Sequence, residues 1–280
     1  MLRQRVLSAA VVIPILFVAV WFGNPWFSII VAVAALLGAI EFYDMFGGGR
    51  WRPITFFGTV WTPFFIFNAY YAHDYSSENT WILATSGLIA SAVVLSLIAV
   101  LVQGSPRERL LYNWAWSLAG ILYVGWLLSY WVLLMNSGEY YGWDGRDWVL
   151  LALFSTFAVD TTAYFVGRAL GRHKLAPSIS PAKTWEGAIG GLVGAIAAVI
   201  ILALLLDTPL DIGYGRLVLI GCLVGVFAQI GDLAESKLKR ITGIKESGAL
   251  IPGHGGILDR LDSIVFTGVV VYYCLRWFVG

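Results

Sequence analysis

Charged side chains are scarce in this sequence. Asp, Glu, Lys and Arg make up 12% of the 280 residues, whereas soluble domains carry about 25%. Hydrophobic residues reach 59% and the mean hydropathy is +0.79, which excludes a soluble globular domain. The net charge of +1 offers no electrostatic attraction for nucleic acid. We therefore expect the chain to reside in a lipid bilayer and to bind no nucleic acid.

Cysteines and several known motifs are also scarce or absent. The two cysteines, Cys222 and Cys274, both lie in apolar runs, which argues against a disulfide scaffold and indicates two small core residues. The sequence has no glycine-rich loop with a phosphate-binding lysine, no closely spaced cysteine pair and no internal repeat. These absences exclude several classes of nucleotide-binding and metal-binding protein.

Nine apolar stretches are long enough, or nearly so, to cross a bilayer, which takes about 20 residues of helix. They cover roughly residues 7–23, 25–46, 54–72, 81–103, 113–136, 148–170, 186–206, 217–235 and 258–279. The first stretch follows two arginines, as in a signal peptide, but it lacks a convincing cleavage site and another span follows directly, so we expect it to remain. The sequence thus predicts an all-α polytopic integral membrane protein with about nine transmembrane helices.

Lysine and arginine fall mostly on one side of these predicted spans. If the N-terminus is cytoplasmic, fifteen of the eighteen basic residues face the cytoplasm, and only Arg146, Arg216 and Arg276 face the outside. Cytoplasmic loops of membrane proteins carry such an excess of Lys and Arg. We therefore predict a cytoplasmic N-terminus and an outside C-terminus.

The two halves of the chain differ in their loops. Residues 1–147, with spans one to five, have short loops and nearly uncharged spans, and we interpret them as a membrane scaffold. Residues 148–280 hold the other four spans and two long, polar inner connections, 168–185 and 232–260. Because binding and catalytic residues are often carried by loops on a rigid scaffold, we place the catalytic region in this second half.

Glycines recur at four-residue spacing in the second half. This spacing is typical of close helix packing in membranes, and we prefer that interpretation to a phosphate-binding loop. The pairs are Gly187 with Gly191, Gly190 with Gly194, and Gly221 with Gly225.

Acidic residues at or within the spans are the first candidates for chemistry, because a charge in the bilayer costs several kcal/mol unless it is paired or metal-bound. Glu41 and Asp44, at the inner end of the second span, are interpreted as solvated interface residues. Asp160, inside the sixth span, either hydrogen-bonds within the helix bundle or lines a site. Asp259 and Asp262 lie one turn apart at the start of the ninth span.

A polar run leaves the inner end of the eighth span. Asp232, Ser236 and either Lys239 or Arg240 have the spacing of one helix face, which would present an acid, a hydroxyl and a base together. The alternative is that these charges only mark the cytoplasmic side and form salt bridges. That alternative explains the lysines more easily than the aspartates at the span edges.

Two inner segments have the composition of phosphate-binding loops. Residues 245–256 read K-E-S-G-A-L-I-P-G-H-G-G, and their glycines allow a ligand close to the backbone; His254 is interpreted as a phosphate or loop contact. Ser180, Lys183 and Thr184 precede the seventh span and could receive phosphate at a helix start. The alternative for this second segment is a turn at Ser180-Pro181 followed by an ordinary helix start. Aspartate oxygens without nearby cysteines suit Mg²⁺ or Mn²⁺ better than zinc.

The run from Ser236 to Asp262 resembles the signature of phosphatidate cytidylyltransferases, also called CDP-diacylglycerol synthases. It reads S-K-L-K-R, then K-E-S-G, then P-G-H-G-G-I-L-D-R-L-D, and it matches in order and spacing over 27 residues. The run from Asp160 to Gly187, with D-T-T-A-Y-F-V-G-R and S-P-A-K-T-W-E-G, is also similar to that family. Glu246 departs from the family pattern, which has Asp there, and we leave it out of the site.

The resemblance implies a membrane enzyme that joins CTP and phosphatidic acid to give CDP-diacylglycerol and pyrophosphate. It implies a Mg²⁺ or Mn²⁺ cofactor, a homodimer, and a site on the cytoplasmic side of a bacterial inner membrane. Asp232 and Asp259 would be metal ligands, acting in catalysis with Lys239 and Arg260. The predicted substrate contacts are Lys183, Thr184, Ser180, Ser236, Arg240, Lys245, His254, Asp262 and Asp160.

The implied reaction is in-line attack of a phosphatidate oxygen on the α-phosphorus of CTP. A phosphate monoester is largely dianionic near neutral pH, so no strong general base is needed and neutralising phosphate charge matters most. Two other functions were weighed. A secondary transporter is disfavoured because polar chemistry is confined to one half of the chain, and an alcohol phosphotransferase acting on CDP-lipids is disfavoured because its D-G-x-x-A-R motif is absent.

Overall fold

The computed structural model describes residues 2–46, 53–74, 78–102, 107–137, 144–206, 212–250 and 255–279. Within these ranges, seven helices are long and apolar enough to cross a membrane, namely Trp26–Met45, Thr80–Val102, Glu108–Asn136, Gly145–Leu170, Trp185–Leu205, Tyr214–Ile241 and Leu258–Phe278. This confirms the predicted helical membrane fold. The first and third predicted spans coincide with helices α1 (Leu2–Phe22) and α3 (Pro53–Tyr70). The count of nine crossings and the sides of the two termini stay predictions.

The chain divides into two compact units. Unit 1 consists of Met1–Asn136 together with Glu246–Asp259, and unit 2 consists of Ser137–Lys245 together with Arg260–Gly280. Glu246–Asp259, which we call the glycine-rich loop up to the start of α11 at Leu258, therefore groups with the N-terminal helices, although it lies far from them in the sequence. The functional division of the chain at residue 147 stays a prediction.

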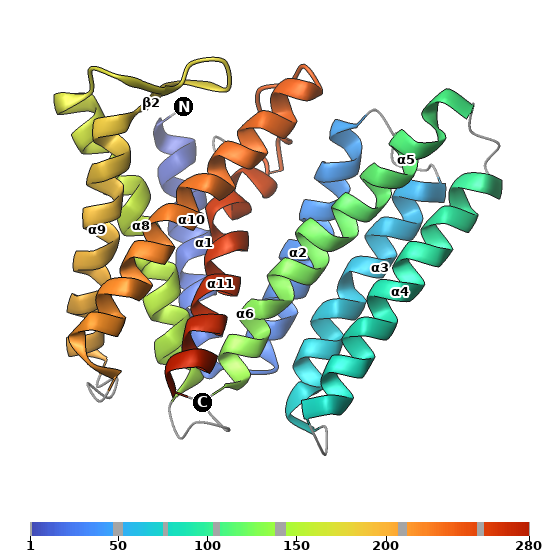
Figure 1. The fold of residues 1–280 in the computed structure, drawn as a ribbon, viewed down its shortest axis with the longest axis horizontal. Coiled ribbons are helices and arrows are strands. Elements are labelled where there is room, and N and C mark those ends of the chain that lie inside the picture. Colours follow the sequence, from blue (N-terminus) through green and yellow to red (C-terminus); the bar gives the residue numbers. More distant parts are fainter. Residues whose placement is uncertain are drawn as a thin grey trace. The chain divides into compact units, whose positions relative to one another are not determined.

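Unit 1 is a bundle of long apolar helices (Figure 1). Its elements are α1, α2 (Trp26–Met45), α3, η1 (Tyr71–Asp74), α4 (Glu78–Val102), α5 (Arg107–Gly120), η2 (Ile121–Trp126) and α6 (Leu127–Asn136). The π-helical turn η2 joins α5 to α6 without a break. Phe65, Ala92 and Ile121, from α3, α4 and η2, form a buried hydrophobic cluster. The tyrosine hydroxyl of Tyr43 in α2 donates a hydrogen bond to the Ser117 carbonyl at 2.7 Å, so α2 is tied to α5.

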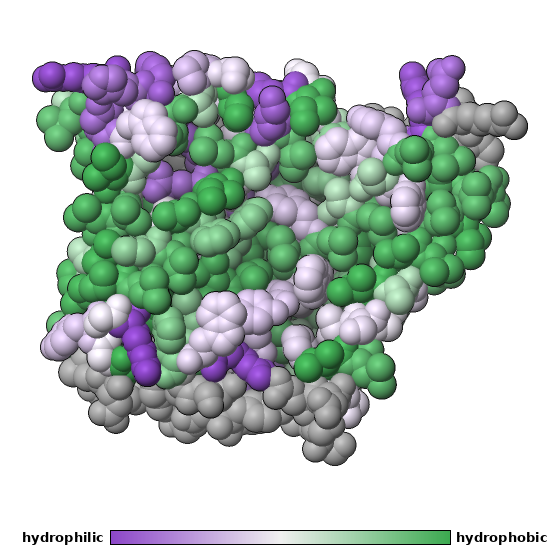
Figure 2. All heavy atoms as spheres, in the orientation of Figure 1, coloured by the Kyte–Doolittle hydropathy of each residue, from purple (hydrophilic) through white to green (hydrophobic). Residues whose placement is uncertain are grey.

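Unit 2 contains four helices and a two-stranded ribbon. They are α8 (Gly145–Leu170), β1 (Lys174–Ala176), β2 (Ser180–Thr184), α9 (Trp185–Leu205), α10 (Tyr214–Ile241) and α11 (Leu258–Val279), whose first two residues belong to unit 1. In Figure 1 the helices α8, α9 and α10 lie side by side, and the ribbon lies across one end of them. Figure 2 shows apolar side chains along these helices and hydrophilic ones gathered at the end that carries the ribbon. This distribution is the one expected of a bundle that spans a bilayer.

The predicted glycine contacts between helices are confirmed. A Cβ added at Gly191 in α9 would lie 3.2 Å from the Ala163 Cβ of α8, and one added at Gly221 in α10 would lie 2.6 Å from the Ile196 Cα of α9. The three helices can therefore approach closely only because these positions lack side chains. The cysteines are free thiols, as predicted, and Cys274 is buried.

The inner connection 168–185 forms the ribbon, which the sequence did not predict. β1 and β2 pair antiparallel, with Lys174 opposite Thr184 and Ala176 opposite Ser180. The interpretation of Ser180-Pro181 as a turn is wrong, because both residues lie in β2. α9 begins directly after the ribbon at Trp185, so the ribbon fixes where the residues just before this helix lie.

Candidate functional site

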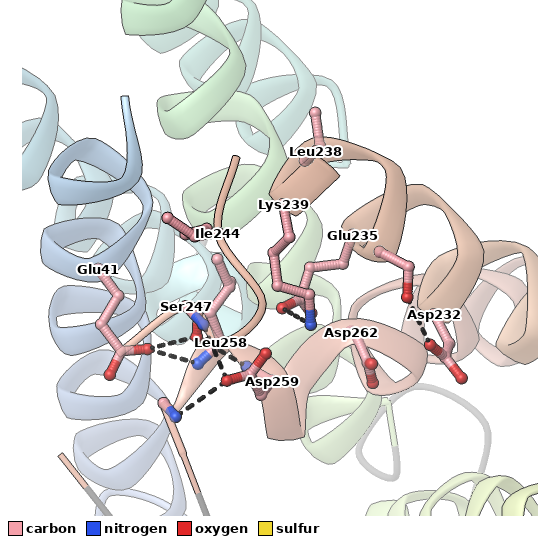
Figure 3. A network of polar contacts seen from close by, with 12 residues as sticks. Glu41, Asp232, Glu235, Leu238, Lys239, Ile244, Ser247, Leu258, Asp259 and Asp262 are labelled. Atoms are coloured by element: carbon pink, nitrogen blue, oxygen red, sulfur yellow. Dashed lines mark hydrogen bonds and ion pairs between the residues drawn. The ribbon is translucent and has the colours of Figure 1, made fainter. Parts of the chain in front are cut away.

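Asp232 and Lys183 form the central ion pair of the candidate site. The Lys183 ammonium, from β2, lies 2.6 Å from one carboxylate oxygen of Asp232, from α10, and the two side chains are 24% and 31% exposed. The Ser236 hydroxyl, one turn along α10, donates to the other oxygen of Asp232 at 3.3 Å (Figure 3). The predicted common face of Asp232 and Ser236 is thus confirmed.

Two further aspartates bring their charges to this pair. Asp160, from α8, interacts electrostatically with Asp232, Lys183 and Arg260, and Asp262, from α11, interacts with both Asp160 and Asp232. We call Asp160, Lys183, Asp232 and Asp262 the Asp232 cluster. Asp160 is exposed and Asp262 is half-buried, whereas the nitrogen of the Lys183 ammonium is buried, so the cluster combines accessible acids with one enclosed cation.

Gly231 explains how α10 and α11 bring two of these acids together. A Cβ at Gly231 would collide with the backbone carbonyl of Asp262 and would lie 2.9 Å from the ring of Phe266. The missing side chain lets α11 contact the backbone of α10 directly beside Asp232. A larger residue at this position would separate the two helices, and Asp232 from Asp262.

Lys239 has a buried acidic neighbour that the sequence analysis did not single out. Glu235 is fully buried, and its carboxylate lies 3.2 Å from the Lys239 ammonium, which is itself only 11% exposed. A buried ion pair of this kind stabilises two charges that would otherwise be costly. The four-residue spacing of an acid and a base on one helix was the available sequence signal.

The remaining predicted cations differ in their surroundings. The Arg240 guanidinium donates to the backbone carbonyls of Ile179 and Ile244, each at 3.2 Å, which ties the end of α10 to the segment between β1 and β2. Lys245 and Arg260 are exposed. His254 lies outside the described residues, so its predicted contact stays a prediction.

Thr184 and Ser180 occupy structural positions in the ribbon. The Thr184 hydroxyl accepts a hydrogen bond from the Gly187 backbone N–H at 3.1 Å, so Thr184 caps the N-terminus of α9. Ser180 pairs with Ala176 at the far end of the ribbon. Their predicted substrate contacts are not tested by this arrangement.

Asp259 lies in a second group of polar contacts, within unit 1. One Asp259 oxygen accepts the backbone N–H groups of Ser247 and Gly256, both at 3.0 Å. The Ser247 hydroxyl donates to Glu41 at 3.1 Å, and the Leu258 N–H donates to the same Glu41 oxygen at 2.9 Å (Figure 3). We call these five residues the Glu41 network.

The interpretation of Glu41 as a solvated interface residue is wrong. Glu41 is only 4% exposed, because the loop after Lys245 and the first turn of α11 cover its carboxylate with hydrogen-bond donors. Asp44, one turn further along α2, is exposed as predicted.

The carboxylates present fit a divalent cation of the predicted kind. The Asp232 cluster has three acids beside one lysine, an excess of negative charge that a cation would reduce, and its donors are oxygens, which Mg²⁺ prefers. Within the described ranges, no three His, Cys, Asp or Glu side chains gather closely enough to hold a metal by themselves. A Mg²⁺ held by one or two carboxylates and by substrate phosphates would need no such group. The pairing of Asp232 with Asp259 as two ligands stays a prediction.

The sequence is similar to a family of known proteins. The sequence pattern of the cytidylyltransferase family matches residues 3–278. A phosphatidate cytidylyltransferase of Synechocystis is 32% identical over 303 aligned residues, which cover 96% of this chain and 95% of that protein. One from Brucella abortus is 41% identical over 198 residues, 69% of this chain and 70% of that protein.

A plant relative is longer than this chain. Phosphatidate cytidylyltransferase 4, chloroplastic, of Arabidopsis thaliana is 41% identical over 218 residues, which cover 68% of this chain. The alignment spans about half of the plant protein, 52% of its length. The similarity therefore concerns only part of the plant protein.

Proposed function

This chain belongs to the cytidylyltransferase family, and from that membership we propose that it transfers the cytidylyl group of CTP to phosphatidic acid, forming CDP-diacylglycerol and pyrophosphate. The relatives named phosphatidate cytidylyltransferase, from cyanobacterial, Brucella and plant sources, support this assignment. The single observation of the site that carries it is the Lys183–Asp232 ion pair, held at 2.6 Å beside two further aspartates.

The proposed reaction is in-line displacement at the α-phosphorus of CTP by an oxygen of the phosphatidate phosphate. The new bond joins that oxygen to the α-phosphorus, and the bond from the α-phosphorus to the pyrophosphate oxygen breaks. Both reactants are anions, so the residues must reduce their repulsion and stabilise the departing pyrophosphate. We assign the neutralisation of phosphate oxygens to Lys183, Arg240, Lys245 and Arg260, and we assign Lys239 the same role from the resemblance.

The Lys183–Asp232 pair is suited to this role. Asp232 fixes the position of the Lys183 ammonium, whose nitrogen is buried although the two side chains are partly exposed, so a phosphate that joins this pair would contact a cation already held in place. Asp232 and Asp259 would hold a divalent cation, Mg²⁺ or Mn²⁺. When bound, that cation supplies positive charge at the phosphates of CTP.

The proposed setting is a bacterial inner membrane with the site on its cytoplasmic side. The two connections 168–185 and 232–260 hold nine of the eighteen basic residues. Nine crossings with the N-terminus inside would place both connections on the cytoplasmic side. CTP would then arrive from the cytoplasm, and phosphatidic acid would enter sideways from the bilayer. A homodimer is part of this proposal and rests on the family resemblance.

The function is tested by incubating the purified protein with Mg²⁺, phosphatidic acid and CTP labelled at the α-phosphate. We expect the label to enter the lipid phase as CDP-diacylglycerol. CTP labelled at the γ-phosphate is the matched control, since its label should leave with pyrophosphate and never enter the lipid. Absence of lipid label from α-labelled CTP would overturn the proposal, and uptake of CTP into vesicles without covalent transfer would point to a transporter.

A further inference from the structure

Glu41 is an acidic side chain in an apolar helix, and none of the site assignments above uses it. It lies near the end of α2 (Trp26–Met45) and is 4% exposed. A buried carboxylate is costly unless hydrogen bonds compensate for the lost hydration. The compensation at Glu41 comes from residues more than 200 positions away, since Ser247 and Leu258 are 206 and 217 residues further along the chain.

One of the two donors to Glu41 is a backbone N–H that the start of α11 leaves unpaired, and the other is the Ser247 hydroxyl. The first N–H groups of a helix have no partner within it. In α11 the Leu258 N–H is accepted by Glu41 at 2.9 Å, and the Asp259 N–H is accepted by the Ser247 hydroxyl at 3.3 Å. Glu41 therefore caps this helix from another helix, partly through Ser247.

The same contacts fix the side chain of Asp259. Its carboxylate accepts the backbone N–H of Ser247, and the Ser247 hydroxyl donates to Glu41. Glu41, Ser247 and Asp259 thus belong to one ring of contacts, closed by the Leu258 N–H on Glu41 and the backbone from Leu258 to Asp259, which joins α2, the glycine-rich loop and the first turn of α11. Loss of the Glu41 carboxylate would therefore alter the position of Asp259, because Ser247 and the Leu258 N–H would both lose their acceptor.

Two glycines show how closely the loop packs on Glu41. A Cβ at Gly248 would collide with one oxygen of the Glu41 carboxylate, and a Cβ at Gly256 would collide with the other oxygen and with the Ser247 hydroxyl. The loop can therefore follow this path only with glycine at both positions. The carboxylate and the loop backbone fit each other without room for another group.

We propose that Glu41 is a positioning residue for the cytidylyl transfer site, which acts by holding Asp259 and the glycine-rich loop in their active geometry. This proposal rests on the proposed function, because it gives Asp259 a role in that reaction. It assigns to the N-terminal half of the chain a specific contribution to a site that the sequence placed in the C-terminal half.

Two substitutions can distinguish the hydrogen-bond acceptor role of Glu41 from the effect of its negative charge. Both hydrogen bonds end on the same oxygen, Oε2, while Oε1 is buried and has no hydrogen-bond partner among the described residues. Glutamine keeps one such acceptor oxygen, whereas alanine has none. We therefore expect Glu41→Gln to retain the geometry of the loop and Glu41→Ala to lose it.

The kinetic experiment compares these variants in the full-length protein in detergent with phosphatidic acid. Removing a residue that orients a metal ligand typically costs 10–100-fold in metal affinity or activity. For Glu41→Ala we expect at least a roughly 10-fold higher Mg²⁺ concentration for half-maximal activity, with a similar fall in kcat and an unchanged KM for phosphatidic acid. Glu41→Gln should stay within about 3-fold of the unaltered protein, and Asp44→Ala, one turn away on the exposed face of α2, should match it.

A second measurement is independent of activity. Hydrogen exchange of peptides covering residues 246–262 should be faster in Glu41→Ala, because the amides of Ser247, Gly256 and Leu258 lose ordered partners, and it should be unchanged in Asp44→Ala. If Glu41→Ala does not fold, Ser247→Ala tests the same ring, since it removes only the bridging hydroxyl. We expect the same direction of change in both measurements.

The outcomes are distinguishable. Normal Mg²⁺ dependence and kcat in both Glu41→Ala and Ser247→Ala would overturn the positioning role, as would a loss that Glu41→Gln shares in full. If the unaltered protein forms no CDP-diacylglycerol, the proposed function fails, and the exchange experiment then decides by itself whether Glu41 orders the loop.

Discussion

The Asp232 cluster and the Glu41 network are both built around carboxylates, yet their partners differ. In the Asp232 cluster the partner of Asp232 is a lysine side chain, and both are partly exposed. In the Glu41 network the Asp259 carboxylate accepts two backbone N–H groups. The Glu41 carboxylate accepts one hydroxyl and one backbone N–H, and Glu41 is buried. A lysine can turn toward an incoming phosphate, whereas a backbone N–H cannot leave its place. The first group is thus suited to chemistry and the second to holding a shape.

Asp232→Asn should have the largest effect on activity and would test the chemical half of this comparison. The substitution removes the charge that pairs with Lys183 while keeping the size of the side chain. We expect CDP-diacylglycerol formation to fall by about 10²–10³-fold, the cost of losing one preorganised electrostatic group at a reacting centre. Asp44→Asn is the matched control, since Asp44 is an exposed acid of α2 outside both groups, and it should retain most activity.

Asp259→Asn tests whether Asp259 binds a metal ion in addition to holding the glycine-rich loop. Asparagine keeps one oxygen that can accept the N–H groups of Ser247 and Gly256, so the loop should stay in place. If Asp259 also holds a metal, metal-dependent release of pyrophosphate should nearly vanish while the protein remains folded in detergent. Full activity in this variant would contradict the metal assignment and leave Asp259 with a structural role alone.

Lys183→Ala should have a smaller effect than Asp232→Asn, because other cations near the site retain part of the positive charge. We expect kcat/KM for CTP to fall by roughly 10–100-fold, with a smaller effect on the stability of the helix bundle because Asp232 keeps its hydrogen bond from Ser236. The measurement is steady-state kinetics at varied CTP, together with a thermal melt. A variant that melts much earlier but turns over normally would show that Lys183 is structural.

Gly256→Ala should affect stability more than catalysis and would test the structural role of the Glu41 network. Its Cβ would collide with Ser247 and Glu41, and overpacking of this kind costs about 1–3 kcal/mol. Gly87→Ala is the control within the same unit, because a Cβ there meets nothing within 4 Å. Thermal melts in detergent should show a lower midpoint for Gly256→Ala only, and equal midpoints would mean that the loop has room to move.

Much of the fold follows from the sequence because its causes are local. Apolar runs of about 20 residues predict spans, and glycines four residues apart predict close helix contacts, as Gly191 and Gly221 confirm. The shared face of Asp232 and Ser236 follows from helix periodicity alone. These features need no knowledge of which helix packs against which.

The parts that could not be predicted depend on contacts between distant segments. The β1–β2 ribbon contains Pro181 and two lysines, Lys174 and Lys183, in a short stretch, so neither alternation nor β-propensity marks it. Glu41 looks like an ordinary interface acid because its two donors lie 206 and 217 residues further along the chain. Charge at a span edge does not by itself reveal whether the residue is solvated or capped by another segment.

The length of α10 sets the depth at which the lipid substrate would react. The 18 residues from Tyr214 to Gly231 measure about 27 Å at 1.5 Å per residue, close to the roughly 30 Å thickness of the hydrocarbon core. If α10 crosses the bilayer from Tyr214, Asp232 would follow the last residue needed to cross the acyl chains, at the level where lipid phosphates begin. A phosphatidic acid molecule could bring its phosphate to this carboxylate by lateral diffusion, with its acyl chains still in the bilayer.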